Sequence, residues 1–190
     1  MKRSGAKAGL MFGMLWCACS SGGTPSGDTP QAVFEPWDGI WKGQFEVLQG
    51  DEVLTTLNVV QRYYSDAPDL QHGRFREQNV ETQEVVTAEA TNRRTEAGLT
   101  CRVVKSTGEE VVHQGEWTGR GIKWFRKTES VEEVFVEEVK TDPDGRTVYF
   151  IDGWGRYDGG PKLTFRGRYR KVGSEAEARR TVEKGDYPQR

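Results

Sequence analysis

The sequence has little of what several common functions require. Its 27 basic residues are outnumbered by 29 acidic ones, for a formal net charge of −2. A nucleic-acid-binding protein is expected to carry a clear basic excess instead. The chain holds only two histidines, and no second His or Cys lies at ligand spacing from them, so a zinc site is not expected. We therefore predict no nucleic-acid partner, no metal and no cofactor.

Long hydrophobic runs are missing as well. The uncharged stretch AGLMFGMLWCA, residues 8–18, is shorter than the roughly 20 apolar residues that a membrane-spanning helix needs. It follows the basic residues Lys2, Arg3 and Lys7, and small residues come after it. This pattern is typical of a secretory signal peptide, which we predict over residues 1–19 of an exported protein.

Cysteine is scarce, with only Cys17, Cys19 and Cys101 in the chain. The stretch WCACSSGG resembles the lipobox of bacterial lipoproteins, with the small residue Ala18 directly before Cys19. The resemblance implies that Cys19 is lipidated and becomes the mature N-terminus. The protein would then be anchored in the bacterial cell envelope, at the outer membrane or in the periplasm. Trp16 departs from the pattern, because an aliphatic residue is usual there, and a cleaved signal without lipid remains the alternative.

Composition divides the rest of the chain. Residues 20–36 are rich in Ser, Gly, Thr and Pro and predict a flexible tether. Residues 37–172 carry most of the aromatic residues and predict one folded domain, because disordered chains lack large apolar groups. Residues 173–190 form a polar tail, in which Ser174 is a plausible N-cap for a short helix.

Helical patterns are nearly absent from the folded domain. Short runs rich in Val, Thr and aromatics alternate with turn residues at regular intervals, which is typical of an all-β sandwich or barrel. Residues 131–140 carry both helical and strand signals, and we predict a strand there. The expected strands lie near 39–48, 53–64, 70–78, 83–91, 99–106, 110–118, 122–129, 132–140, 147–152 and 162–172.

These strands predict a closed barrel. Polar and apolar residues alternate along them, as in antiparallel sheets that face water on one side. A single sheet of about ten strands tends to curl and close, which also removes exposed edges. We predict a single antiparallel up-and-down β-barrel of about 8–10 strands, with another antiparallel barrel or a sandwich as the alternative.

A short motif opens the first expected strand. Gly39 and Trp41, separated by one residue, resemble the G-x-W signature of lipocalins and the wider calycin group. The resemblance implies that Trp41 closes one end of the barrel and that a cation from the last strand lies over its ring. The last strand contains FRGRYRK, so Arg166, Arg168 or Arg170 is expected in that role through a cation–π contact.

Candidate chemistry is limited. Cys101 alternates with Leu99 and Val103 and is expected to face the core as a small apolar group. No G-x-S-x-G motif is present. The Gly-rich stretch IDGWGRYDGG, which we expect to be a loop at the barrel mouth, lacks the Lys-Ser/Thr of a phosphate loop. Whether the protein is an enzyme stays open, although the sequence favours a non-catalytic protein; an enzyme with Asp152 or Asp158 as base is one alternative.

The leading hypothesis is a monomeric, exported and lipid-anchored barrel that binds a small hydrophobic ligand. An envelope interaction protein with a side-chain-filled barrel is the runner-up. His113 is expected to point inward, as a core histidine or, less favoured, as a ligand for a polar group or haem. The expected cavity-lining residues are Trp41, Phe45, His113, Trp117, Phe125, Tyr149 and Tyr169.

Overall fold

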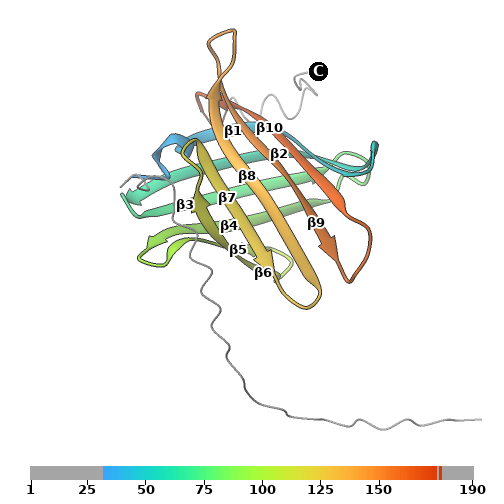
Figure 1. Ribbon diagram of the computed structural model, residues 1–190. Helices are drawn as coiled ribbons and strands as arrows, with labels where there is room; N and C mark the ends of the chain where they lie inside the picture. Colours follow the sequence, from blue (N-terminus) through green and yellow to red (C-terminus); the bar gives the residue numbers. More distant parts are fainter. Residues whose placement is uncertain (1–31, 175, 177–190) are drawn as a thin grey trace, which may run out of the picture.

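The computed structural model describes residues 32–174 and Ala176, and these fold into a closed barrel of ten antiparallel strands (Figure 1). A 3-10 helix, η1 (Glu35–Trp37), comes first. The strands are β1 (Gly39–Gln49), β2 (Glu52–Ala67), β3 (Leu70–Asn79), β4 (Val85–Thr95), β5 (Gly98–Lys105), β6 (Glu110–Trp117), β7 (Gly121–Lys127), β8 (Val131–Thr141), β9 (Thr147–Tyr157) and β10 (Leu163–Val172).

The connectivity is up-and-down throughout. Each strand pairs with its neighbours in the chain, and β1 pairs with β10 from Ile40 opposite Val172 to Leu48 opposite Thr164. This last pairing closes the sheet, so no edge strand is left. The predicted single antiparallel barrel is confirmed, and every expected strand is present, including β8, where the sequence signals conflicted.

The Gly-rich stretch IDGWGRYDGG differs from its prediction. We expected a loop there, but β9 continues as a strand through Tyr157. A Cβ at Gly153 would lie 2.4 Å from the Val134 carbonyl oxygen of β8. Glycine at this position therefore permits a close approach of two strands, rather than marking a turn.

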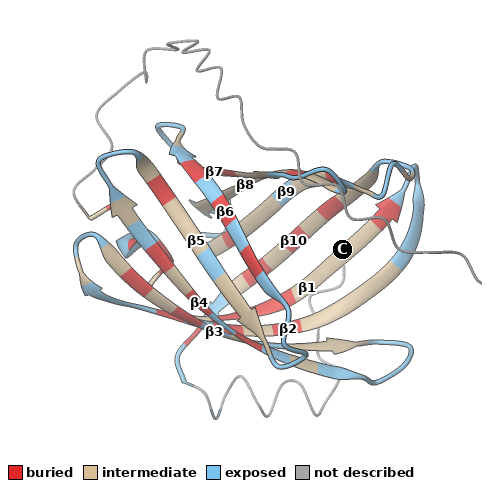
Figure 2. Ribbon diagram, turned by 90° about the horizontal axis from the view of Figure 1, so that it is seen from below, coloured by how far each residue is buried: buried red, intermediate tan, exposed pale blue. Residues whose placement is uncertain are grey.

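Alternation along the strands separates an inner from an outer face. On β10, Phe165 and Tyr169 are buried, whereas Arg166 pairs with Glu46 and Arg168 with Asp152 on the outside. Figure 2 shows the buried residues along the strands and the exposed residues mainly in the hairpins. The inner face thus collects the apolar residues, as an antiparallel sheet with one wet face requires.

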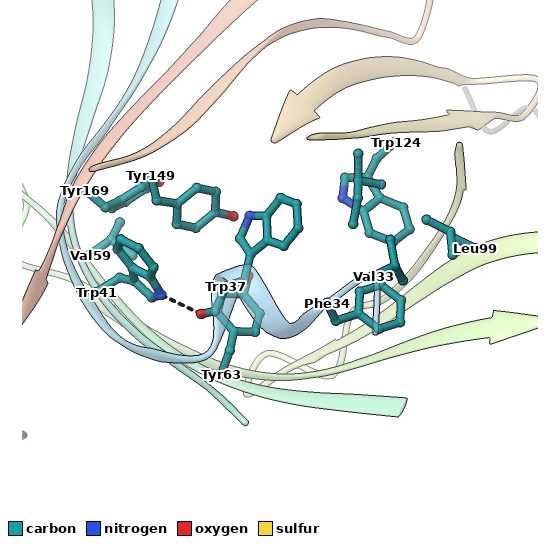
Figure 3. Packing of buried hydrophobic residues seen from close by; sticks show 11 residues of the cluster. Val33, Phe34, Trp37, Trp41, Val59, Tyr63, Leu99, Trp124, Tyr149 and Tyr169 are labelled. Carbon is teal, nitrogen blue, oxygen red and sulfur yellow. Dashed lines mark hydrogen bonds between the residues drawn. The ribbon is translucent and has the colours of Figure 1, made fainter. Parts of the chain in front are cut away.

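One end of the barrel is closed by the segment that precedes β1. Val33 and Phe34 are each 1% exposed and Trp37 is 2% exposed. In Figure 3, Trp37 lies between Trp41 on one side and Phe34 on the other. We call residues 33–38 the plug. Because Val33 and Phe34 belong to the core, folded structure begins inside the range 20–36 that we expected to be a tether.

Buried polar groups fix the plug in place. The Trp41 indole Nε1 donates to the Trp37 carbonyl oxygen at 2.6 Å. The Gln71 amide of β3 donates to the Phe34 carbonyl at 2.9 Å and to Asp38 Oδ1 at 2.8 Å, and it accepts from Asn92 of β4 at 2.9 Å. The Trp41 bond gives the buried Trp37 carbonyl a partner, which is costly to leave out, and the Gln71 amide is a second donor to the Phe34 carbonyl beside the Trp37 main-chain amide.

Several predictions fall outside the described residues. The signal peptide over residues 1–19, the acylated Cys19, most of the tether and nearly all of the tail at 173–190 lie there. Within the described part, no helix has the length and apolar character needed to cross a bilayer.

Candidate ligand-binding cavity

The barrel encloses a cavity of about 340 Å³. It reaches towards the end of the barrel opposite the plug, which we call the open end, where the β1–β2, β3–β4, β5–β6, β7–β8 and β9–β10 hairpins lie. Its apolar wall consists of Phe45, Val47, Leu57, Val59, Phe75, Ala88, Val103, Phe135, Ile151 and Phe165. The small side chain of Cys101 also lines it, and its polar wall consists of Gln61, Tyr63, Glu77, Lys105, His113, Glu133, Glu137, Tyr157 and Tyr169.

The structure places the predicted ligand-binding residues in different environments. Phe45, His113 and Tyr169 are in the cavity wall. Trp41 and Tyr149 are fully buried beside the plug, with their rings 5.5 Å apart in an edge-to-face contact. They form the floor below the cavity rather than its wall. The binding roles of all these residues stay predictions.

The two remaining candidates do not line the cavity. Trp117 is partly buried and packs against the core cluster. Phe125 is opposite Gln114 on the outer face, where the Lys123 ammonium is 6.0 Å from its ring centroid. Its neighbour Trp124, 1% exposed, is the inward aromatic residue. Of two adjacent aromatics on a strand only one can face the core, and we selected the wrong one.

The cation over Trp41 also differs from the prediction. Lys171 of β10 holds its ammonium 5.4 Å from the Trp41 ring centroid, whereas Arg166 and Arg168 point outward. Lys171 has this position because it is directly opposite Trp41 in the β1–β10 pairing, on the same side of the sheet, and it stays exposed at the end of the barrel. A Cβ at Gly39 would lie 2.5 Å from Lys171 Cε. Glycine in the G-x-W motif therefore leaves the space through which the lysine reaches the ring.

A network of polar side chains surrounds Glu133, which is 8% exposed. Its carboxylate accepts a hydrogen bond from Arg126 Nε at 2.8 Å, is 3.0 Å from His113 Nε2, and accepts a short hydrogen bond from the Tyr157 hydroxyl. Burial opposes ionisation, but the hydrogen bonds from His113 and Tyr157 and the charge of Arg126 outweigh it and lower the pKa of Glu133 to about 2. Glu133 is therefore charged and held in one place.

Glu137 has the opposite environment. Burial raises its pKa from 4.5 to about 7, although Trp124 and Tyr149 lie close enough to lower it in part. The Tyr149 hydroxyl nevertheless forms no hydrogen bond of ordinary geometry. Protein surrounds the carboxyl group, yet the side chain keeps accessible surface because it faces the cavity.

Sequence reasoning missed the inward glutamates. By charge alone, the pairs Glu132–Glu133 and Glu137–Glu138 are typical of solvent-facing positions. Adjacent residues of a strand point to opposite faces, however, so one member of each pair has to face inward once both faces of β8 are assigned. Alternation from the inward Phe135 identifies Glu133 and Glu137, and this signal was available from the sequence.

Cys101 is the remaining candidate for chemistry in the cavity. Cys101 is unpaired and lines the cavity, as expected of a small apolar group, and burial raises its pKa. A raised pKa keeps the group as a thiol, the less reactive form. Among the described residues, no group of three or more His, Cys, Asp or Glu side chains is arranged to hold a metal ion.

Comparison with known proteins gives a likeness in fold. No protein-family model matches the chain, and no curated protein is significantly similar in sequence. The structure is similar to an S-type phycobiliprotein lyase from Guillardia theta, with a TM-score of 0.52 and 11% identity over 75% of this chain and 92% of that one. A de novo designed fluorescence-activating β-barrel covers 74% of this chain and 98% of its own at 12% identity, with a TM-score of 0.37. The first likeness establishes a shared lipocalin-like barrel fold and does not extend to function.

Proposed function

We propose that this protein binds a small, largely apolar molecule inside its barrel. The observation that carries the proposal is the cavity of about 340 Å³, closed at one end by the plug and lined mainly by aromatic and aliphatic side chains. Small-molecule sites usually occupy roughly 300–1,000 Å³ and combine an apolar wall with a few placed polar groups. A barrel of about eight strands is just wide enough to be filled by side chains, and ten strands leave more room.

The site is preformed on rigid elements. Every cavity-lining residue lies on a strand of the closed sheet. The ion pairs and hydrogen bonds of Glu133 connect β6, β7, β8 and β9 across the inner face. Binding therefore requires little reordering of the wall, which favours affinity.

The test blocks the cavity without disturbing the outer surface. Ala88 faces the cavity, and its neighbour Thr87 is exposed on the outside of β4. We expect the neutral probe N-phenylnaphthylamine to gain fluorescence with the wild-type protein and with Thr87→Phe, and to lose this gain with Ala88→Phe. Thermal unfolding of both variants checks that the barrel is intact. Absence of binding to the wild type, or equal binding to a folded Ala88→Phe variant, would overturn the proposal.

We further propose that the protein is exported and anchored through a lipid on Cys19. Support comes from the basic start, the short apolar run and the small residue before this cysteine. The test is metabolic labelling with a palmitate analogue in a bacterial host, followed by separation of membranes. Cys19→Ala should lose both the label and membrane association, whereas the control Cys17→Ala should keep them. Label retained by Cys19→Ala would exclude Cys19 as the acceptor.

A further inference from the structure

The charges on the cavity wall are unevenly matched. Glu133 is neutralised by Arg126, 2.8 Å away. Lys105 lies close enough to Glu77 to lower the pKa of that carboxyl, although burial raises it more, and the Lys105 ammonium pairs with Glu109 at 2.9 Å. Glu137 has no ion pair with any described residue, and no cation contributes to its pKa. Among the described residues that line the cavity, Glu137 is therefore the carboxyl group on whose pKa no cation acts.

Aromatic rings surround this carboxyl group from several strands. Tyr63 of β2 and Tyr169 of β10 line the same cavity as Glu137. Burial, and after it the charge of Glu137 among other groups, raises the pKa of both tyrosines and of Tyr149 on β9. The Tyr149 ring centroid is 5.1 Å from that of Tyr169 and 6.4 Å from that of Tyr63. Ring faces attract cations, so this part of the cavity combines a carboxylate with an aromatic enclosure.

Buried polar groups without partners face the same region. Gln61, 3% exposed, lines the cavity, and its side-chain nitrogen has no hydrogen-bond partner. The hydroxyl of Tyr149, a residue with no exposed surface, also lacks one. Buried polar atoms in native proteins are nearly always paired with protein, water or ligand. Gln61 thus offers a hydrogen-bond donor to whatever occupies the cavity.

We propose that the cavity binds small organic cations, in which a protonated amine on an aromatic or apolar body pairs with the Glu137 carboxylate. The inference deepens the proposed ligand binding and rests on it. The ammonium group supplies the missing counter-ion, the tyrosine rings add cation–π attraction, and the phenylalanines of the wall cover the apolar body. An anion is disfavoured, because it would have to enter beside Glu77, Glu133 and Glu137 without a free cation to meet it.

The hairpins at the open end are mainly acidic, which also favours a cationic ligand. Their loops between strands carry Asp51, Glu81, Glu84, Glu109, Glu129 and Asp158 against one basic residue, Lys162. The Lys162 ammonium lies 4.7 Å from the Trp154 ring centroid on the outer face. A cleft lined by one sign of charge raises the local concentration of ions of the opposite sign. The entrance therefore favours cations before they reach Glu137.

The experiment compares three probes with the same aromatic body and different charge: naphthylmethylamine, naphthylmethanol and naphthoate. Calorimetric titration of the full chain at about pH 8, where Glu137 is ionised, should give the highest affinity for the amine and the lowest for naphthoate. Glu137→Gln should weaken amine binding at least about tenfold and change binding of the alcohol by less than about threefold. The matched control is Glu138→Gln, because Glu138 is the next residue of β8, faces outward and pairs with Lys140.

The outcomes separate the two proposals. If none of the three probes binds, ligand binding in the barrel is wrong and the inference falls with it. If the alcohol binds as well as the amine, or Glu137→Gln leaves amine affinity unchanged, the cavity binds ligands but the charge assignment is overturned. Loss of amine affinity in Glu138→Gln would likewise overturn it, by attributing recognition to surface charge. Thermal unfolding establishes that each variant is folded.

Discussion

Replacing Glu137 by Gln should stabilise the ligand-free protein above neutral pH and leave its stability nearly unchanged in acid. The pKa of Glu137 is about 7 in the folded state against an ordinary value of 4.5. Between these values the folded protein holds a proton that the unfolded chain has released. The free energy of unfolding therefore falls as the pH rises through this window. Below about pH 4.5 both states carry the proton, and the difference disappears.

The size of the effect follows from the two pKa values. One pH unit corresponds to about 1.4 kcal/mol, so the change from 4.5 to about 7 corresponds to about 3 kcal/mol at high pH. Because the side chain keeps accessible surface, part of this cost is screened, and we expect Glu137→Gln to add about 2 kcal/mol at pH 8. For a protein of this length that is an increase of about 4–8 °C in Tm. Gln has nearly the same size, so packing contributes little.

The groups that face Glu137 do not obscure the measurement. Tyr63, Tyr149 and Tyr169 have raised pKa values, as does Cys101 on β5, so all four stay neutral between pH 4 and 8. Urea unfolding followed by tryptophan fluorescence at both pH values, with Glu138→Gln as control, measures the difference. A stabilisation of equal size at pH 4 and pH 8, or a loss of stability at pH 8, would refute the reasoning.

Other expectations test the plug, the Glu133 network and the cation over Trp41. Trp37→Ala should lower the free energy of unfolding by about 3–5 kcal/mol, because it empties the closed end; an unchanged urea midpoint would mean that the plug is not part of the cooperative core. Glu133→Gln should cost about 2–3 kcal/mol at neutral pH. The contribution of Glu133 is lost as the pH falls from 4.5 to about 2, so an acid-unfolding curve that the variant leaves unaltered would contradict this. Lys171→Met should cost about 0.5–1 kcal/mol and Lys171→Arg less, because a guanidinium keeps the cation over Trp41; equal losses in urea unfolding would show that the charge is irrelevant.

The fold could be predicted from the sequence because, in an antiparallel sheet, the local residue pattern shows which side chains face inward. Alternation with a period of two fixes which residues face inward, and turn residues such as Asp142 and Gly145 end the strands. In the structure the Asp142 side chain accepts hydrogen bonds from two later main-chain amides of its hairpin. Each strand also pairs with its neighbours in the chain, so strand order needed no long-range information.

The errors arose where the meaning of a residue depends on a distant neighbour. Gly153 lies in a Gly-rich stretch that is typical of a turn, but glycine is needed there because the β8 backbone lies too close for a side chain. Val33 and Phe34 follow a Ser, Gly and Pro-rich stretch, and nothing local indicates that they return into the barrel. The inward glutamates are a different case. Alternation from Phe135 identifies Glu133 and Glu137 as inward residues. They were missed because charged side chains are usually exposed.

Burial of the ionised Glu137 carboxylate destabilises the ligand-free protein. This gives a way to distinguish a charged ligand from a purely apolar one. A cation that pairs with the carboxylate binds the ionised form, so its stabilisation of the folded state has to grow as the pH rises towards and above 7. The facing tyrosines and Cys101 stay neutral over this range and do not compete for the cation. Naphthylmethylamine should therefore raise Tm more at pH 8 than at pH 6, while naphthylmethanol should raise it equally at both. If the two probes show the same pH dependence, the apolar wall alone determines binding, and the carboxylate serves some other purpose.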